Sequence, residues 1–366
     1  MKKILLFSLL FFIFIGSVNA STLTANSYIL MDQTTGRVLA GKNYNNPMLI
    51  ASITKIMTCL LAIESEKLDE IVVVDDIINK SYGSGIYIEV GEELTLRDLL
   101  YGLMLRSGND AALMIAKYIS GDVENFVSMM NNKAKEIGMT NTIFNNPSGL
   151  DNTDSGNYSS AYDMALLTRY AMQYEEYRKI VKTKKYKLKT NKKTYIWHNK
   201  NKLLQYDYIT GGKTGYTEKA KRTLVSTASY NNIDLIVVTI KDSDDWNTHT
   251  SLYENTFQNY KAYRVLNKKN FDIIGDTFYN GDFYIKKDVY IPLKDKEGNN
   301  LIGKIKLKTN KNYKNNDKVG EYLIYLDDNF LYKEDIFIKN INKKSQKLFS
   351  LFKENTLWWT IYLVYL

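Results

Sequence analysis

The chain has 366 residues, more than a single hydrophobic core usually supports, so its length predicts one large domain and a smaller one. Hydrophobic residues make up 45% of the chain and charged residues 24%, which excludes wholesale disorder and a polytopic membrane protein. The formal net charge of +9 suits a protein that works beside anionic lipids or anionic polymers.

Residues 1–20 have the pattern of a secretory signal peptide. Lys2 and Lys3 precede an apolar run from Ile4 to Ile15, and small residues lead up to Ala20, after which we expect cleavage. An uncleaved N-terminal anchor is the alternative, but the run is short for a hydrocarbon core of about 30 Å. Export also makes nucleic acid a poor partner for this basic chain.

The cysteine and histidine content limits the chemistry. Cys59 is the single cysteine, so no intrachain disulfide can form, and we expect its side chain to pack as a small hydrophobe. His198 and His249 are too few for a three-histidine metal site and lie far apart in the sequence. The sequence therefore argues against a conventional zinc hydrolase.

The N-terminal half predicts a hairpin followed by helices. Ser27–Leu39 is typical of two short strands joined by a turn at Gly36, the start of an antiparallel sheet. Ile50–Ser65 lacks Gly and Pro and is rich in apolar residues, which predicts a buried helix that begins near Ser52. Further helices are predicted over Leu96–Met104, Asp110–Ile119, Asp122–Ile137 and Tyr162–Met172.

The helix predicted over Asp122–Ile137 carries apolar side chains at helical spacing, with Asp122 as a plausible N-cap. We expect this stripe to face the core rather than a ligand. Its members are Phe126, Met129, Met130, Ala134 and Ile137.

The C-terminal half predicts strands. Arg222–Ala228 and Ile233–Ile240, joined by a turn at Asn231-Asn232, would complete the sheet. From about Phe271 onward, short β-patterned runs alternate with glycines, which predicts a small all-β second domain. The Lys-rich stretches are interpreted as solvated faces or hairpin loops rather than binding sites. These stretches are Lys182–Lys193 and Lys308–Lys318.

The tail over residues 343–366 places several lysines before the apolar, aromatic stretch Leu357–Leu366. As a helix this stretch would cover roughly 15 Å, about half of a bilayer core, so it cannot span a membrane alone. We expect a helical anchor that lies in the plane of the membrane interface or inserts shallowly, with Trp358 and Trp359 at the headgroup level. The alternative is that the tail docks on the protein's own β domain.

Three short motifs could carry chemistry: Ser52-Ile53-Thr54-Lys55, Ser107-Gly108-Asn109 and Lys213-Thr214-Gly215. A Ser followed by a Lys three residues later on a helix places both side chains on one face, so the amine can take the hydroxyl proton. The lysine must be neutral to do so, which requires burial and a neighbouring cation to lower its pKa from about 10.4. Taken alone, Ser52 and Lys55 would be an N-cap serine and a surface lysine.

In this order the three motifs resemble those of β-lactamases and penicillin-binding proteins, with Ser-Gly-Asn in place of Ser-Asp-Asn. Their surroundings closely resemble the low-molecular-mass penicillin-binding proteins that are serine-type D-Ala-D-Ala carboxypeptidases. The resemblance covers about Ser27 to Ile240. The segments that carry it are Ala51–Thr58, Leu99–Ala112, Phe144–Asp151 and Gly212–Thr217.

The resemblance implies an acyl-enzyme mechanism in which Ser52 is the nucleophile, Lys55 its general base and Ser107 a proton relay to the departing D-alanine. It implies that Asn109 hydrogen-bonds the substrate peptide. An oxyanion hole would use the backbone N–H groups of Ser52 and Tyr216. None of these roles needs a metal or a cofactor.

The resemblance also implies how the substrate is held. Lys213 and Thr214 would meet its terminal carboxylate, and Gly215 would let it lie against a strand edge. The substrate would be a peptidoglycan stem peptide that ends in D-Ala-D-Ala, and β-lactam antibiotics would be covalent inhibitors. The protein would act outside the cell, at the outer face of the cytoplasmic membrane, anchored by its tail.

The fold implied is mixed α/β (α+β), β-lactamase/transpeptidase-like, with an antiparallel sheet flanked by helices, an all-helical subdomain and a small C-terminal all-β domain. We expect a signal peptide over residues 1–20 and a catalytic domain over 21–265. A β-rich domain over 266–342 and the membrane-anchor tail over 343–366 would follow.

Two departures from the family pattern put loop geometry near the site in doubt: Ala220-Lys221 stands where Ala-Gly is common, and Asn157 where His is common. A β-lactamase would need a base for deacylation, and nothing in the spacing of Glu89, Glu92 and Glu93 marks one. A transpeptidase would differ only in its acceptor. A non-catalytic wall-binding protein would not need the motifs together.

Overall fold

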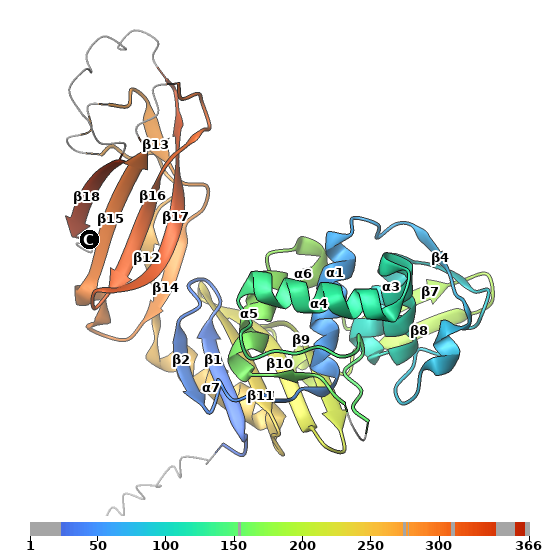
Figure 1. The fold of residues 1–366 in the computed structure, drawn as a ribbon. Helices are drawn as coiled ribbons and strands as arrows, with labels where there is room; N and C mark the ends of the chain where they lie inside the picture. Colours follow the sequence, from blue (N-terminus) through green and yellow to red (C-terminus); the bar gives the residue numbers. More distant parts are fainter. Residues whose placement is uncertain are drawn as a thin grey trace, which may run out of the picture.

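The computed structural model describes residues 23–152, 155–273, 276, 278–308 and 312–341, and the backbone of residues 356–362. The predicted signal peptide and the rest of the predicted tail lie outside these residues. Figure 1 shows two bodies: a mixed α/β domain and, beside its β1–β2 hairpin, a domain built of strands. The fold class predicted from the sequence is confirmed.

The centre of the large domain is an antiparallel sheet with strand order β2-β1-β11-β10-β9. Its strands are β1 (Ser27–Asp32), β2 (Val38–Lys42), β9 (Ile209–Thr217), β10 (Lys221–Tyr230) and β11 (Ile233–Ile240). The hairpin predicted around Gly36 and the strands predicted on either side of Asn231-Asn232 are confirmed. Both asparagines of that turn have positive φ, which Asn tolerates better than most residues.

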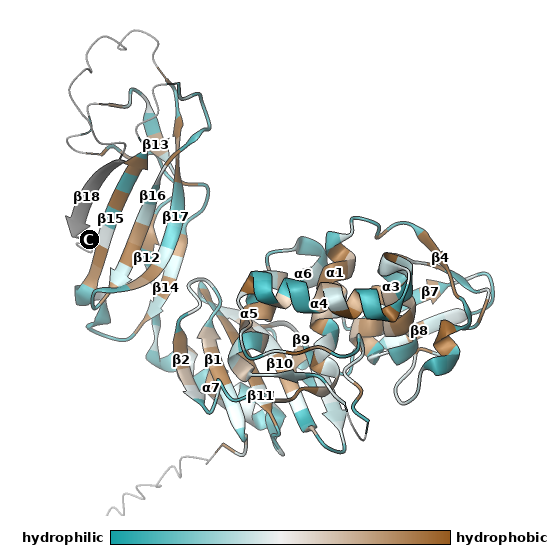
Figure 2. Ribbon diagram, in the orientation of Figure 1, coloured by the Kyte–Doolittle hydropathy of each residue, from teal (hydrophilic) through white to brown (hydrophobic). Residues whose placement is uncertain are grey.

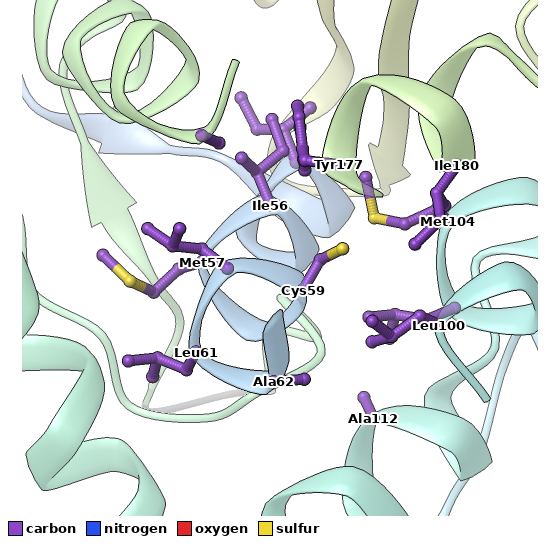
Figure 3. Packing of buried hydrophobic residues seen from close by; sticks show 14 of the residues in the cluster. Ile56, Met57, Cys59, Leu61, Ala62, Leu100, Met104, Ala112, Tyr177 and Ile180 are labelled. Carbon is purple, nitrogen blue, oxygen red and sulfur yellow. The ribbon is translucent and has the colours of Figure 1, made fainter. Parts of the chain in front are cut away.

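Helices cover the sheet and form a subdomain beside it (Figure 1). They are α1 (Lys55–Glu64), α2 (Leu96–Tyr101), α3 (Asn109–Ser120), α4 (Val123–Ile137), α5 (Ala161–Ala171), α6 (Glu175–Lys182) and α7 (Asp245–Asn259). Helix α1 is buried from Lys55 to Ile63, and Figure 3 shows its side chains surrounded by apolar groups of other helices. Cys59 is fully buried there, as expected for a small hydrophobe.

The N-cap and most of the apolar stripe of α4 agree with the sequence prediction. Asp122 accepts a hydrogen bond from the backbone N–H of Asn125, and Phe126, Met130 and Ala134 are buried. Met129 is 36% exposed, so its assignment to the core is wrong. The reason is the narrowness of the buried face: the opposite side of α4 is polar and faces solvent (Figure 2).

Helices α6 and α7 were not predicted from the sequence, and the Lys-rich stretch 182–193, interpreted as a solvated face or hairpin loop, contains most of a β-hairpin. Helix α6 is short, and a hairpin of β7 (Lys185–Lys189) and β8 (Thr194–His198) follows it. Smaller pairs are β3 (Met48–Leu49) with β6 (Tyr158–Ser159), and β4 (Ile71–Val73) with β5 (Glu93–Thr95). Short helical turns are η1 (Ala51–Thr54), η2 (Asp76–Lys80), η3 (Gly102–Arg106, a π-helical turn), η4 (Lys202–Gln205) and η5 (Glu297–Asn300).

The second domain is built of strands packed around its own apolar cluster. Strand β12 (Lys261–Leu266) pairs with β14 (Val289–Leu293), and a larger sheet has the order β13-β17-β16-β15-β18. Its strands are β13 (Asp282–Tyr284), β15 (Leu301–Lys308), β16 (Lys318–Leu326), β17 (Asn329–Lys339) and β18 (Thr356–Tyr362). Because β12 pairs within this domain, we infer that the domain begins near Lys261 rather than at residue 266.

The tail differs from the helix that its sequence predicts over the part that the structure describes. Thr356–Tyr362 forms β18, which pairs antiparallel with β15 at the edge of the second sheet. β-Branched and aromatic residues dominate this stretch, and such residues favour a pleated backbone where a free sheet edge is available. Among the described residues, no helix is both long enough and apolar enough to cross a membrane.

Candidate active site

The Ser-x-x-Lys motif lies at the entry to helix α1. Ser52 belongs to the turn η1, and Lys55 is the first residue of α1. The Lys55 Nζ donates a hydrogen bond of 3.1 Å to the Ser52 Oγ. The predicted pairing of hydroxyl and amine is therefore present in the fold.

Lys55 is 0% exposed, which is rare for a lysine. Its Nζ also donates to the Asn109 Oδ1 at 2.7 Å and to the Ser148 carbonyl oxygen at 2.6 Å. Burial and, to a smaller extent, the charge of Lys200 lower the pKa of Lys55 to about 7 against the opposing effect of Asp110. A substantial fraction of Lys55 can therefore be neutral near neutral pH and accept a proton.

The second and third motifs meet through a hydrogen bond between their side chains. Ser107 ends the turn η3 with a φ of 65°, and its Oγ accepts a hydrogen bond of 3.0 Å from the Lys213 Nζ. Lys213 is 1% exposed. Burial and the charges of Lys55 and Lys200 lower the pKa of Lys213 well below its usual range. Each hydroxyl thus has a buried amine as its neighbour.

Strand β9 is an edge strand of the sheet, and the glycine at residue 215 lets it lie close against the nucleophile turn. A Cβ at Gly215 would lie 2.3 Å from the Thr223 Oγ1 and 3.0 Å from the Ser52 backbone nitrogen. Tyr216 is exposed, and the two lysine-bearing segments meet around a cleft of about 270 Å³. Its walls include Ser52, Ser107, Thr214, Gly215 and Tyr216.

All predicted site residues therefore gather around one cleft, although they come from η1, α1, the end of η3, α3 and β9. Asn109 lies beside it, with its Nδ2 bonded to the Tyr82 carbonyl oxygen. The profile of a peptidase family described as "D-alanyl-D-alanine carboxypeptidase" matches residues 16–244, which is more than half of the chain. The chain belongs to this D-alanyl-D-alanine carboxypeptidase family.

Curated relatives of the same family agree. The D-alanyl-D-alanine carboxypeptidase DacF of Bacillus subtilis is 39% identical over 256 residues, which cover 67% of this chain and 65% of that protein. DacC of Escherichia coli is 33% identical over 244 residues, which cover 63% of this chain and 59% of that protein. The matched part thus spans about two thirds or less of these two relatives.

Solved structures of the family share the fold. Penicillin-binding protein 5 of Haemophilus influenzae superposes with a TM-score of 0.69 at 26% identity, covering 88% of this chain and 99% of that one. A D-alanyl-D-alanine carboxypeptidase of Mycobacterium tuberculosis gives 0.63 at 31% identity, covering 67% of this chain and 95% of that one.

The cleft has further polar residues that sequence reasoning missed. Ser84, Lys200, Arg222, Asp245 and Trp246 line it together with the motif residues. The Arg222 guanidinium forms an ion pair with the buried Asp245 carboxylate and lies 5.3 Å from the centre of the Trp246 ring. Arg222 sits directly opposite Tyr216 in the antiparallel pairing of β9 and β10.

Asn157, one of the two departures from the family pattern, bears on Lys55. Asn157 is 1% exposed, and its side chain accepts from the backbone N–H groups of Asn145 and Asn146. It also donates to the Thr54 Oγ1 at 3.0 Å and to the Asn146 carbonyl oxygen at 2.8 Å. Asn157 therefore ties the nucleophile turn to the loop whose Ser148 carbonyl holds Lys55.

The same loop contains a position that requires glycine. Gly149 has a φ of +80°, and a Cβ there would lie 1.9 Å from the Ala51 carbonyl oxygen. The second departure, Lys221, has a φ of 60°, a conformation that glycine adopts more easily, and its side chain is exposed. Asn157 is thus held by hydrogen bonds to its surroundings, whereas Lys221 adopts a backbone conformation that is unfavourable for a residue other than glycine.

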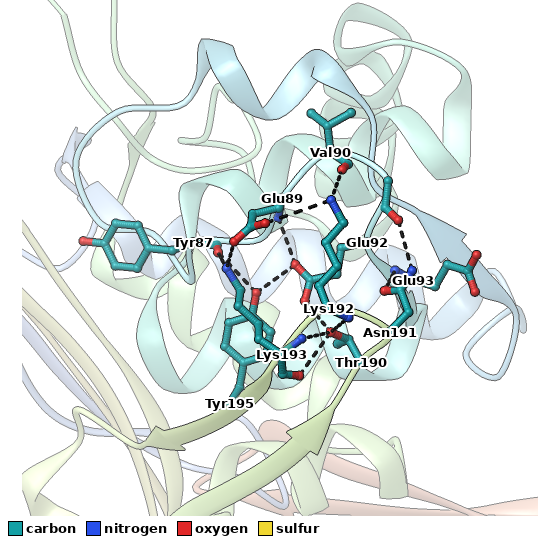
Figure 4. A network of polar contacts seen from close by, with 11 residues as sticks. Tyr87, Glu89, Val90, Glu92, Glu93, Thr190, Asn191, Lys192, Lys193 and Tyr195 are labelled. Atoms are coloured by element: carbon teal, nitrogen blue, oxygen red, sulfur yellow. Dashed lines mark hydrogen bonds and ion pairs between the residues drawn. The ribbon is translucent and has the colours of Figure 1, made fainter.

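The glutamates considered for a β-lactamase base are engaged elsewhere. Figure 4 shows Glu89, Glu92 and Glu93 in a network with the tip of the β7–β8 hairpin. Glu92 is fully buried and accepts from the hydroxyls of Tyr195 and Thr190. In the part of the chain that the structure describes, the one carboxylate lining the cleft is Asp245, which is paired with Arg222.

Proposed function

We propose that this family member is a serine-type D-Ala-D-Ala carboxypeptidase that removes the terminal D-alanine of peptidoglycan stem peptides through an acyl-enzyme on Ser52. The single observation that carries the proposal is the hydrogen bond between the Ser52 Oγ and the fully buried Lys55 Nζ. A serine becomes a nucleophile when an adjacent base removes its proton, and a buried amine with a pKa of about 7 is such a base.

In acylation, the Ser52 Oγ attacks the carbonyl carbon of the penultimate D-alanine while its proton passes to neutral Lys55. Backbone N–H groups of Ser52 and Tyr216 stabilise the oxyanion. The bond to the terminal D-alanine nitrogen then breaks, and Ser107 relays a proton to the leaving amine. Ser107 is suited to this step because its Oγ lies 3.0 Å from the Lys213 Nζ.

Substrate binding follows from the same geometry. A terminal carboxylate beside Lys213 and Thr214 would compensate the cost of burying the Lys213 charge and would raise its pKa again. Arg222 adds a second cation at the mouth of the cleft, held by Asp245. Strand β9 offers its free edge to the peptide, Gly215 lets that strand lie close to Ser52, and Asn109 supplies an amide beside the cleft.

Deacylation completes the cycle when water attacks the ester, restoring Ser52 and releasing the shortened peptide. β-Lactams would acylate the same serine and leave it slowly. The engagement of Glu89 and Glu92 with the hairpin tip argues against rapid β-lactamase turnover. The motif residues around one cleft likewise argue against a wall-binding protein without catalysis.

Intact-mass spectrometry of the protein with a penicillin tests the function. We expect one covalent adduct, mapped to the peptide that contains Ser52, and none on the Ser52→Ala variant. An adduct on Ser107, or no adduct while a control enzyme reacts, would contradict the mechanism.

For location, we propose export by residues 1–20 and action at the outer face of the cytoplasmic membrane, with the tail over residues 343–366 as anchor. The lysines that precede the apolar stretch Leu357–Leu366 support a membrane anchor, because basic residues next to an apolar segment favour binding to an anionic membrane surface. The pairing of β18 with β15 supports the alternative that the tail completes the second domain.

Deletion of residues 345–366 distinguishes a membrane anchor from a structural strand of the second domain. An anchor predicts an active enzyme released from membranes with an unchanged melting temperature. A structural strand predicts a melting temperature several degrees lower. Membrane association of the truncated protein would show that the tail is not the anchor.

A further inference from the structure

The segment that leads from α6 to the cleft has an extreme charge imbalance. Between Glu176 and Asp207 it contains no carboxylate residue. Over the same stretch it contains the cations Arg178, Lys179, Lys182, Lys184, Lys185, Lys187, Lys189, Lys192, Lys193, Lys200 and Lys202.

The β7–β8 hairpin orders part of this charge on one face. Lys185, Lys187 and Lys189 alternate with inward residues, and their cross-strand partners are His198, Ile196 and Thr194. All six of these side chains are exposed. Behind them, Tyr186 stacks on Tyr101 with ring centres 3.8 Å apart, and Trp197 is buried. The inner face therefore fixes the hairpin and leaves the lysines directed outward.

The lysines of the hairpin differ in their ion pairing. At the tip, Lys193 and Lys192 pair with Glu89. In contrast, Lys185, Lys187 and Lys189 have no ion pair with any residue that the structure describes. Alternate residues on a strand lie about 6–7 Å apart, within the Debye length at physiological salt, so these cations repel one another. An anion docked on this face would relieve the repulsion.

The hairpin is connected to the cleft through Lys200. Strand β8 leads directly to Lys200, whose Nζ donates to the Ser84 Oγ at 3.3 Å. Ser84 and Lys200 both line the cleft that contains Ser52. A chain that leaves the cleft at this rim would therefore run out along the hairpin, a distance of roughly 17 Å for five strand residues.

We propose that the outer face of the β7–β8 hairpin docks the acidic, carboxylate-bearing part of the peptide whose terminus is cleaved. The inference rests on the proposed function and deepens it, because it adds a charge requirement remote from the D-Ala-D-Ala terminus. A peptide is the occupant that the geometry favours, since β8 leads directly to Lys200 at a cleft that, under the proposed function, receives a peptide. A phosphodiester polymer is a less suitable occupant, because it has no group that would bind in the cleft lined by Ser84.

Two peptides with the same D-Ala-D-Ala terminus test the proposal. Each carries an extension of about six residues, which can reach the hairpin at about 3.4 Å per residue, with Glu at alternate positions in one and Gln in the other. The kcat/KM of both is measured across a salt series. The test variant is Lys185→Gln/Lys187→Gln/Lys189→Gln. Its matched control, with the same charge change on the second domain, is Lys268→Gln/Lys269→Gln/Lys314→Gln.

We expect the wild-type protein and the control variant to prefer the Glu peptide by about fivefold or more at low ionic strength, and salt to remove the preference. The hairpin variant should cleave the Gln peptide normally and lose the preference, whereas the three Lys→Arg changes should keep it. Equal kcat/KM for both peptides in the wild type, or a preference retained by the hairpin variant, would overturn the proposal.

Failure of the proposed function is distinguishable from failure of this inference. If the Gln peptide is cleaved but charge has no effect, only the docking surface is wrong. If neither peptide is cleaved, fluorescence anisotropy of the labelled Glu peptide on the Ser52→Ala protein tests docking alone. Salt-sensitive binding that the hairpin changes abolish supports the surface. No binding, or binding of poly(glycerol phosphate) alone, refutes it.

Discussion

The lysines of the cleft and those of the β7–β8 hairpin belong to one domain, yet their surroundings are opposite. Lys55 and Lys213 are buried, each beside a serine hydroxyl, and burial lowers the pKa of both amines. Lys185, Lys187 and Lys189 stand in solvent on an ordered strand. The comparison teaches that burial converts a lysine from a source of positive field into a proton acceptor.

The largest expected effect is on the cleft side of this comparison. Lys55→Ala should slow acylation of Ser52 by a penicillin by about 10²- to 10⁴-fold, because it removes the base that activates the hydroxyl. Stopped-flow measurement of acylation checks this. Lys189→Ala, an exposed lysine of the hairpin, is the matched control and should acylate at the wild-type rate. Equal acylation rates for the Lys55→Ala and Lys189→Ala variants would show that the cleft lysine has no special role in acylation.

The pH profile sharpens the same contrast. Lys55 must be neutral to act, and its pKa is lowered to about 7, so acylation should be slow below this pH and rise as pH increases through it. Between about pH 8 and pH 5 the neutral fraction of such an amine falls by close to two orders of magnitude. The kcat/KM of an uncharged ester substrate, measured across this range, reports the pKa of the free enzyme. A flat profile would mean that Lys55 is not the base.

Carboxylate recognition depends on the second buried lysine. Replacing the terminal carboxylate of a D-Ala-D-Ala peptide by an amide should cost about 2 kcal/mol or more of transition-state binding, roughly 30-fold in kcat/KM, because Lys213 and Thr214 lose a charged partner. The matched substrate pair is compared on wild type and on a Lys213→Ala variant. If Lys213 makes this contact, the variant should discriminate much less between acid and amide.

The smallest effect concerns a neutral residue that positions a lysine. Asn157→Ala removes four hydrogen bonds that join the nucleophile turn to the loop holding Lys55. We expect acylation to slow by about tenfold and the free energy of unfolding to fall by about 1–3 kcal/mol. Asn125→Ala, on the exposed face of α4, is the control. A loss of stability with an unchanged acylation rate would limit Asn157 to a structural role.

The motif residues were predictable from the sequence because each segment has a local pattern. The distances between their side chains were not predictable, because they depend on segments far apart in the sequence. That Lys55 has the Ser148 carbonyl as a partner depends on a loop about ninety residues away in sequence, held by Asn157. Likewise, the positive φ of Ser107 is imposed by the turn η3, and no pattern in its neighbours signals it.

Some missed elements had a readable signal. In α6, Tyr177, Ile180 and Val181 are buried at helical spacing. The hairpin alternates lysines with apolar residues at a period of two, as a half-buried strand does. The pairing of Arg222 with Asp245 had none, because it joins β10 to the start of α7 only after the sheet has formed.

The strand order has a consequence for how the protein is made. One edge of Ser27–Asp32 pairs locally with β2, but its other edge pairs with the far end of the domain, Asp32 with Leu235 and Ser27 with Ile240, so that edge waits for nearly the whole domain before it has a partner. Closing such a long loop costs entropy that few local contacts can offset early, and contacts of this separation slow folding. Since Ser52 lies between β2 and α1 while Lys213 lies on β9, a nascent chain that has emerged only as far as α6 carries the nucleophile but no cleft. We therefore expect the nascent chain to lack catalytic activity until β9, β10 and β11 have joined the sheet that contains β1.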